Sequence, residues 1–411
     1  MANNFKNTSL VTRIALKEFM NALQLGAKVD RQYDSQFRKV GNAINVRRPV
    51  MFVSESGAAI GSNNDVEERA AVLTLDSREK VSFAVSSEDL TLSVEDFTSR
   101  FVQPAMAELA QVVESAIAAK YYQIGNFVGT AGTAPSTFLE VGGAAKVLKK
   151  LGTPMSSSGM RWCAFYDEDA SLALADGLKA VFPSQIATKA IEEASIGKYS
   201  SFDMYENQSL ALHEVGAHGG TPLINGASQD VTYAASGDAW TQSLITDGWT
   251  NSVTGILKQG DVFTIAGVNS VNRKTRQDTG DLQTFSVQAD ANSGASTGPA
   301  TLTISPPMIT SGPYQTVSAA PADNAAIVVK TGVASSSHKQ NLAFHKNAIT
   351  LAMAPLDLPT EGASASRESY KGLSIRAVRQ YNINSDETTY RFDILFGVKA
   401  LNPDFAVRTT S

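Results

Sequence analysis

The chain has 411 residues and a formal net charge of -5 at pH 7, with 43% hydrophobic and 18% charged residues. This length favours two or three domains, and the apolar content is enough for a sizeable core. A net negative chain lacks the global basic field that holds nucleic acid, so any contact with DNA must be local or merely enclosing. The single cysteine, Cys163, excludes an internal disulfide and a cysteine-based zinc site.

The N-terminal residues predict an amphipathic helix on a polar arm. Apolar side chains recur at helical spacing over residues 10–25, among them Leu10, Ile14 and Phe19, and Gly26 follows as the expected stop. The segment lacks a basic stretch followed by an uninterrupted apolar core, so we expect no signal peptide. Nowhere do about 18 apolar residues run together, so we expect no membrane span either.

The next segment predicts an extended hairpin with a polar tip, between roughly residues 50 and 80. The strand-like runs "INVRRPVMFV" and "AVLTLDSREKVSFAV" are joined by the Gly/Ser/Asn-rich "SESGAAIGSNND". Such a projection has little core of its own and needs something to lie on, such as a neighbouring subunit. Four charged residues next to the tip are candidates for that contact: Arg47, Arg48, Glu67 and Glu68.

A long helix follows the hairpin. Ser93 and Asp96 have the spacing of a capping box, and apolar residues then recur at intervals of three or four up to Ile124. Pro104 is expected to kink this helix or to mark the start of its regular part. The regular part, residues 105–124, would be a rod about 30 Å long.

The second half of the chain predicts a β module inserted into an α/β region. Residues 140–225 alternate helical patterns such as "GGAAKVLKKLG" with short strands such as "RWCAFYD". Residues 226–335 contain no glutamate and carry short strand-like runs between turn signals, which is typical of a small all-β barrel or sandwich. Longer alternating strands return after residue 337. We therefore expect an α+β fold with an inserted β-barrel.

Two short motifs suggest enzymes, and both fit poorly. "HEVGAH" holds His213 and His218 five residues apart, whereas a zinc protease helix needs a spacing of four. Ser77 and Lys80 give the S-x-x-K motif of serine acyl-transferases, and Y-x-N and K-T-G follow in the right order. The segment around Ser77 predicts a strand, in which positions three apart point to opposite faces. The serine enzyme stays an alternative, and we expect no catalytic residue, cofactor or metal.

One charged loop is a candidate for contacts between copies of the chain. "NRKTRQDTGD" sets Arg273, Lys274 and Arg276 just before Asp278 and Asp281. A loop with separated positive and negative ends is self-complementary, so two copies related by a two-fold axis could pair plus to minus. Exposed pairs contribute at most about 1 kcal/mol each, so such pairing would set register more than strength.

The order of these elements resembles the major capsid proteins of short-tailed phages of the Salmonella-phage coat group, which carry an inserted β domain on the Hong Kong 97-type capsid fold. The N-terminal half is similar in its layout of arm, hairpin and long helix. The C-terminal half is similar in four specific stretches: "LKQGDVFTIAGVNSVN" (257–272), "LTISPPMI" (302–309), "NLAFHKNAITLAMAPLDLP" (341–359) and "GLSIRAVRQYNINSDETTYRFDILFGVKALNPDFAVR" (372–408).

The resemblance implies a structural protein that self-assembles, as hexamers and pentamers, into an icosahedral shell around double-stranded DNA. The partners it implies are further copies of the chain, a scaffolding protein and a portal protein, and it leaves open whether decoration proteins bind. It implies assembly in the host bacterial cytoplasm and a final place in the virion. A tail or adhesion protein is the third possible function, beside the capsid protein and the serine enzyme. The implied division is an arm, an extended hairpin, a spine helix with a peripheral region, a first axial part, the inserted β-barrel and a second axial part, over residues 1–43, 44–92, 93–139, 140–225, 226–335 and 336–411.

Overall fold

The chain folds into two compact units, each built from separate stretches of sequence. A computed structural model describes residues 7–33, 41–48, 50–53, 68–86, 97–154, 162–178, 197–360 and 363–411. Unit 1 consists of Met1–Val46, Val72–Ile117 and Ile349–Lys399, and unit 2 of Arg47–Ala71, Ala118–Ala348 and Ala400–Ser411. Both units combine helices with mainly antiparallel sheets, which confirms the predicted α+β class. Among the described residues, no helix has both the length and the apolar character needed to cross a membrane.

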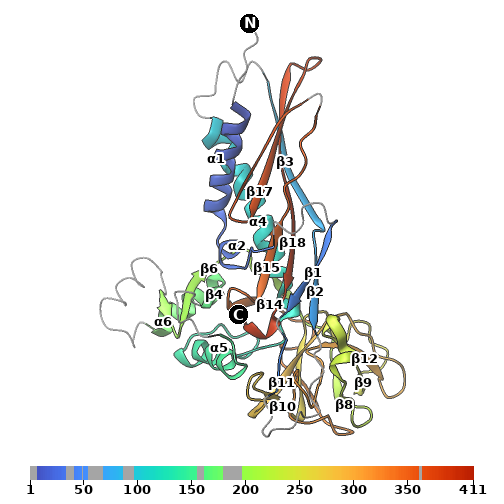
Figure 1. Ribbon diagram of the computed structural model, residues 1–411. Helices are drawn as coiled ribbons and strands as arrows, with labels where there is room; N and C mark the ends of the chain where they lie inside the picture. The colour runs from blue at the N-terminus through green and yellow to red at the C-terminus, as the bar shows by residue number, and fades with distance from the viewer. Residues whose placement is uncertain are drawn as a thin grey trace, which may run out of the picture. The chain divides into compact units, whose positions relative to one another are not determined.

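Unit 1 contains the predicted N-terminal and spine helices. Helix α1 (Asn7–Ala22) lies along strand β17 (Figure 1), and α4 (Gln103–Ala118) is the spine. Pro104 lies in the first turn of α4, after a short π-helical turn over Thr98–Val102, so it does mark the start of the regular helix. Gly26 does not end a helix as expected. It lies inside a second short helix, α2 (Leu25–Lys28).

A carboxylate of the spine helix caps the N-terminus of α2. Glu114 is 3% exposed and accepts hydrogen bonds from the backbone N–H groups of Gln24, Leu25 and Gly26, at 3.0, 2.9 and 2.9 Å. The first N–H groups of a helix have no partner within the helix, and a negative charge there also suits the helix dipole. Glu114 therefore fixes α2 to α4.

The sheet of unit 1 is formed mostly by the C-terminal strands. Its order is β15-β18-β17-β16, and β3 pairs with β18 along ten residues. Phe392, Ile394 and Phe396 of β18 share a buried face. Asp393 on the other face is also fully buried, and it accepts bonds from Arg376 and Arg391. The strands are β3 (Ser77–Ser86), β15 (Ile349–Met353), β16 (Ser364–Tyr370), β17 (Leu373–Asn382) and β18 (Glu387–Ala400).

The base of the predicted extended hairpin is a two-stranded sheet. Strand β1 (Ala43–Arg48) pairs with β2 (Arg69–Thr74), and the chain passes from one unit to the other within both strands. The expected tip of this hairpin lies outside the described residues, as does the expected capping box at Ser93 and Asp96.

A five-stranded sheet with two helices, here called the mixed sheet, forms one part of unit 2. Its order is β19-β14-β4-β6-β5, with β4 and β6 parallel. Its apolar side chains, among them Trp162, Tyr166 and Phe202, pack with those of the helices in one buried cluster. The elements are α5 (Phe138–Lys150), β4 (Trp162–Tyr166), α6 (Glu168–Leu178), β5 (Lys198–Tyr199), β6 (Phe202–Glu206), β14 (Ser337–Phe344) and β19 (Ala406–Thr410).

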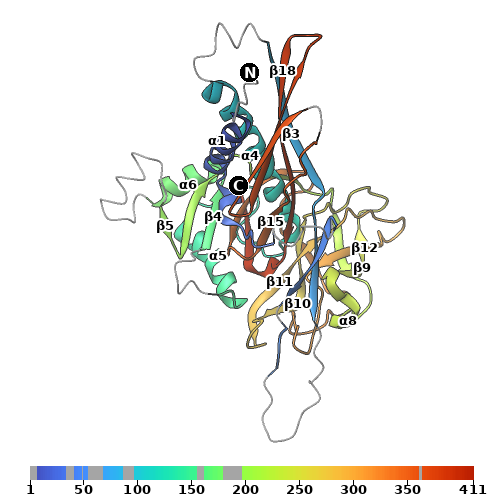
Figure 2. The same cartoon turned by 45° about the horizontal axis from the view of Figure 1, so that its top comes forward.

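A six-stranded barrel, here called the β module (residues 220–329), forms the rest of unit 2. Its sheet has the order β13-β10-β11-β12-β9-β8, and a bridge between Leu223 and Ala326 joins the two outer strands. The predicted barrel is thus confirmed, with its own buried core around Trp249, Phe263 and Phe285. Figure 2 shows β10 and β11 side by side. The strands are β8 (Gly220–Ile224), β9 (Gln242–Trp249), β10 (Val262–Val271), β11 (Asp278–Val287), β12 (Ala300–Ser305) and β13 (Ile327–Val329).

The chain leaves the mixed sheet for the β module and returns from it at one place. Strand β7 (Leu212–Glu214) comes just before the β module, and it pairs antiparallel with the start of β14, just after the module. His213 stands opposite His338 in this ladder. The finer division of the chain into six parts stays a prediction.

Candidate functional site

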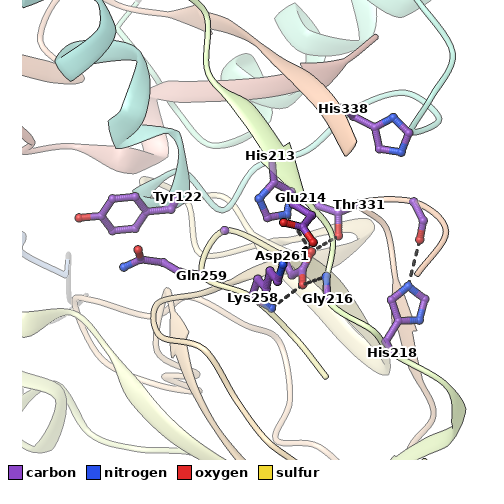
Figure 3. Close-up of polar contacts among 12 residues, drawn as sticks. Tyr122, His213, Glu214, Gly216, His218, Lys258, Gln259, Asp261, Thr331 and His338 are labelled. Atoms are coloured by element: carbon purple, nitrogen blue, oxygen red, sulfur yellow. Dashed lines mark hydrogen bonds and ion pairs between the residues drawn. The ribbon is translucent and has the colours of Figure 1, made fainter. Parts of the chain in front are cut away.

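A buried carboxylate lies where the chain enters and leaves the β module. Asp261 directly precedes β10, is 0% exposed and accepts four hydrogen bonds (Figure 3). The donors are the backbone N–H of Lys258 (2.7 Å), Nε2 of His213 (2.8 Å), the hydroxyl of Thr331 (2.8 Å) and the backbone N–H of Gly216 (3.0 Å). His213 and Gly216 precede the module and Thr331 follows it. The side chain of Asp261 therefore bonds the segment that enters the module and the segment that leaves it.

The electrostatics of this cluster favour the ionised carboxylate. Burial alone raises the pKa of Asp261, but the bond and charge of His213 and the bonds from Lys258 and Thr331 outweigh it and hold the pKa below its usual 3.8. On the other side of the imidazole ring, the Tyr121 hydroxyl lies 2.9 Å from Nδ1 of His213. Both carboxylate oxygens already accept two bonds each, so the arrangement suits a structural junction rather than acid–base chemistry.

The two histidines of "HEVGAH" do not converge. Nε2 of His218 donates to the backbone oxygen of Gly332 at 3.0 Å, whereas His213 faces Asp261. Across the part of the chain that the structure describes, no three His, Cys, Asp or Glu residues gather as a metal site. Ser77 and Lys80 both lie on β3, where Ser77 is half-buried and Lys80 exposed. The predicted strand is confirmed, and with it the separation of these two side chains onto opposite faces.

Arg273 of the charged loop is used within the chain. Its side chain is 6% exposed, and its guanidinium forms two bonds of 3.3 Å to the carboxylate of Asp404. It also donates to the backbone oxygen of Thr316 at 2.8 Å. Arg273 is thus paired with a residue 131 positions further along the chain, and its contact with another subunit stays a prediction.

The other charges of the loop are divided between internal and exposed positions. Arg276 donates to the backbone oxygen of Phe52 at 2.7 Å, and Asp281 is bonded to Lys150 of α5, which holds the pKa of Asp281 below its usual range. Lys274 and Asp278 are exposed. Both are therefore accessible to a second copy, and the two-fold contact of this loop stays a prediction.

The candidates at the base of the hairpin differ from one another. Arg47 and Glu68 are exposed and 3.8 Å apart, as a weak surface ion pair. Arg48 points to the other side of β1, is only partly exposed and lies near Arg69 of β2. Glu67 lies outside the described residues.

Sequence reasoning missed two features of unit 2. It did not assign Asp261 a role. The aspartate stands directly before the apolar run "VFTIAGV", and this position at the start of a buried strand was the available signal. It also missed Arg69, whose guanidinium lies 3.6 Å from the centroid of the Trp240 ring. The two residues are far apart in sequence, so no local pattern indicates that contact.

Comparison with known proteins gives matches along the whole chain. The family model of the P22 coat protein (gene protein 5) matches residues 1–408. A major capsid protein of Acyrthosiphon pisum secondary endosymbiont phage 1 is 25% identical over 429 aligned residues, covering 98% of each chain. A solved structure from Mycobacterium phage Che8 has a TM-score of 0.47 at 13% identity, covering 95% of this chain and 90% of that one. The CUS-3 coat protein I-domain is 29% identical over 27% of this chain and 96% of its own, with a TM-score of 0.20.

Proposed function

The chain belongs to the P22 coat protein family, and from that premise we propose that many copies of it form the icosahedral shell of a tailed bacteriophage. It is a phage major capsid protein, with a structural rather than an enzymatic role and a place in the virion. The observation that carries this conclusion is the family match over residues 1–408, joined by a capsid relative that aligns over 98% of both chains. The geometry of the shell and the partners of the chain are proposals.

The proposed shell is built from hexamers and pentamers and encloses double-stranded DNA without binding a specific sequence. A net charge of -5 supports an enclosing role, because a shell with a strongly basic inner wall would retain DNA where it first touched. A scaffolding protein and a portal protein are the proposed partners during assembly in the host cytoplasm. Each contact between subunits can be weak, because a closed shell repeats it many times.

The exposed charges of the loop between β10 and β11 support a contact between copies across two-fold axes. Lys274 lies in the turn between β10 and β11, and Asp278 is the first residue of β11, so a two-fold axis at this loop would place Lys274 of one copy beside Asp278 of the other. Charge reversal at Lys274 and Asp278 singly should each weaken shell formation. Reversal of both together should restore it, because the pairing survives with its signs exchanged. Equal yields of shells from all three variants would contradict this contact.

Negative-stain electron microscopy tests the proposal as a whole. The protein is purified after expression with and without the scaffolding gene of the same phage. Closed shells or tubes are the expected result, with more uniform shells when the scaffolding protein is present. A protein that stays monomeric under every condition would refute the proposal.

A further inference from the structure

Unit 2 contains a basic pocket that the capsid role does not explain. The pocket has a volume of about 370 Å³ and lies beside the loop between β10 and β11. Its lining includes five cationic side chains and one carboxylate, that of Asp404. Apolar residues, among them Met51 and Phe52, complete the lining, and Phe52 is 70% exposed. The cations are Arg48, Arg69, Arg273, Lys274 and Arg276.

The Nε atom of Arg48 is a buried donor without an acceptor among the described residues. Arg69 is 7% exposed, and its guanidinium stacks on the ring of Trp240. Arg273 takes both oxygens of Asp404, and the nearby Asp238 accepts from the backbone N–H of Ala70 instead.

This arrangement is costly in a single copy of the chain. Burial and the charge of Arg69 lower the pKa of Arg48 to about 10, and burial also lowers the pKa of Arg69. Buried donors without acceptors, and like charges close together, both destabilise a fold. We expect a ligand outside the single copy to offset this cost. Planar guanidiniums suit an oxyanion that accepts two parallel hydrogen bonds.

We propose that this pocket binds a carboxylate side chain from a second copy of the chain. The inference rests on the proposed function, because assembly is what brings a second copy to the pocket. The chain has 40 acidic against 35 basic residues, so its own copies supply the carboxylates. A pocket of this volume admits a side chain. A DNA duplex presents its phosphates on a broad convex surface, which suits a pocket of this volume and the 7% exposure of Arg69 less well than a single side chain does.

The first test separates the stability of the single copy from assembly. Arg48→Gln removes a buried charge that the neighbouring Arg69 repels and that Asp404 and Asp238 attract, so the urea midpoint of the monomer should change little. In the shell it removes one of the guanidiniums that would bind the carboxylate, which should weaken association roughly thirty-fold or more at each contact. Lys149→Gln is the matched control, because Lys149 is an exposed cation of unit 2 outside the pocket. It should form shells like the wild type.

Equal shell yields from Arg48→Gln and Lys149→Gln would overturn the inference, and so would a monomer clearly destabilised by Arg48→Gln. A wild-type protein that forms no shells would instead refute the proposed function, so the two failures are distinguishable.

The second test leaves every arginine in place. A photoreactive benzoylphenylalanine replaces Phe52 at the pocket, and shells are assembled from a mixture of isotopically light and heavy copies. Light-to-heavy crosslinks at a peptide containing aspartate or glutamate are the expected result. Crosslinks only within one copy, or only to scaffolding protein or DNA, would overturn the proposal.

Discussion

Asp261 is the residue whose removal should most clearly test the account of unit 2. Asp261→Ala removes the acceptor of four hydrogen bonds at a site that is 0% exposed. The Thr331 hydroxyl and the His213 ring can turn to other partners, but the backbone N–H groups of Gly216 and Lys258 cannot. Each buried unsatisfied donor costs about 1–3 kcal/mol, so the two together predict a loss of about 4 kcal/mol.

Asp261→Asn is the discriminating companion variant. The amide oxygen can still accept from both backbone N–H groups, and the amide nitrogen can donate to Thr331. It can also donate to Nε2 of His213 if the ring proton moves to Nδ1, where the Tyr121 hydroxyl accepts it. Because bonds to a charged acceptor are roughly twice as strong as neutral ones, we expect a smaller loss of about 1–2 kcal/mol.

The two variants should also differ from the wild type in their dependence on pH. The pKa of Asp261 is lower in the folded chain than its usual 3.8, so its contribution to stability is complete above that value and is lost as the pH falls through the folded pKa. Both variants should lack this acid-dependent component.

Equilibrium urea unfolding of the monomeric full chain, at pH 7 and at several acidic values, measures both effects. A loss below about 1 kcal/mol in Asp261→Ala would refute the reasoning, because the donors would then have found other acceptors.

Three further predictions concern other contacts of the fold, each measured by urea unfolding. Glu114→Ala should cost about 3 kcal/mol, because it leaves three N–H groups at the start of α2 without an acceptor, two of them buried, and a loss under about 1 kcal/mol would contradict that role. Gly216→Ala should cost about 2 kcal/mol or more, since the added Cβ would lie 2.5 Å from the Cα of Leu257, and wild-type stability would show that the backbone yields there. Lys150→Ala, which breaks the half-exposed pair with Asp281, should cost at most about 1 kcal/mol, and less at high salt. A larger loss that does not change with salt would contradict the assignment of a screened surface pair.

The elements that the sequence predicted well depend on local periodicity. The spacing of apolar residues identified α1 and α4, and turn signals identified the strands of the β module. Gly26 was misjudged because a glycine after an apolar run commonly ends a helix, whereas here the carboxylate of Glu114 starts another one. That carboxylate comes from a residue 88 positions away, so no local pattern could show it.

The internal contacts of the charged loop could not be predicted for a related reason. Its sequence shows the order of positive and negative residues, but not that Arg273 bonds to Asp404 or that Asp281 bonds to Lys150. These partners lie 131 positions away in both cases, in parts of the chain that only folding brings close. A charge pattern in a loop therefore predicts the character of a surface less safely than periodicity predicts a helix, because any internal partner removes a charge from that surface.

The pairing of β7 with β14 makes the β module, in topological terms, an enlarged hairpin turn. Glu214 stands opposite Ser337, so everything between them is a loop whose ends are already held together by the ladder and by Asp261. Closing a long loop costs little more free energy than closing a short one, so the length of the β module hardly destabilises the mixed sheet. Such a site can accept an exchangeable cassette, because a foreign domain with adjacent ends would meet the same two strand ends in the same register.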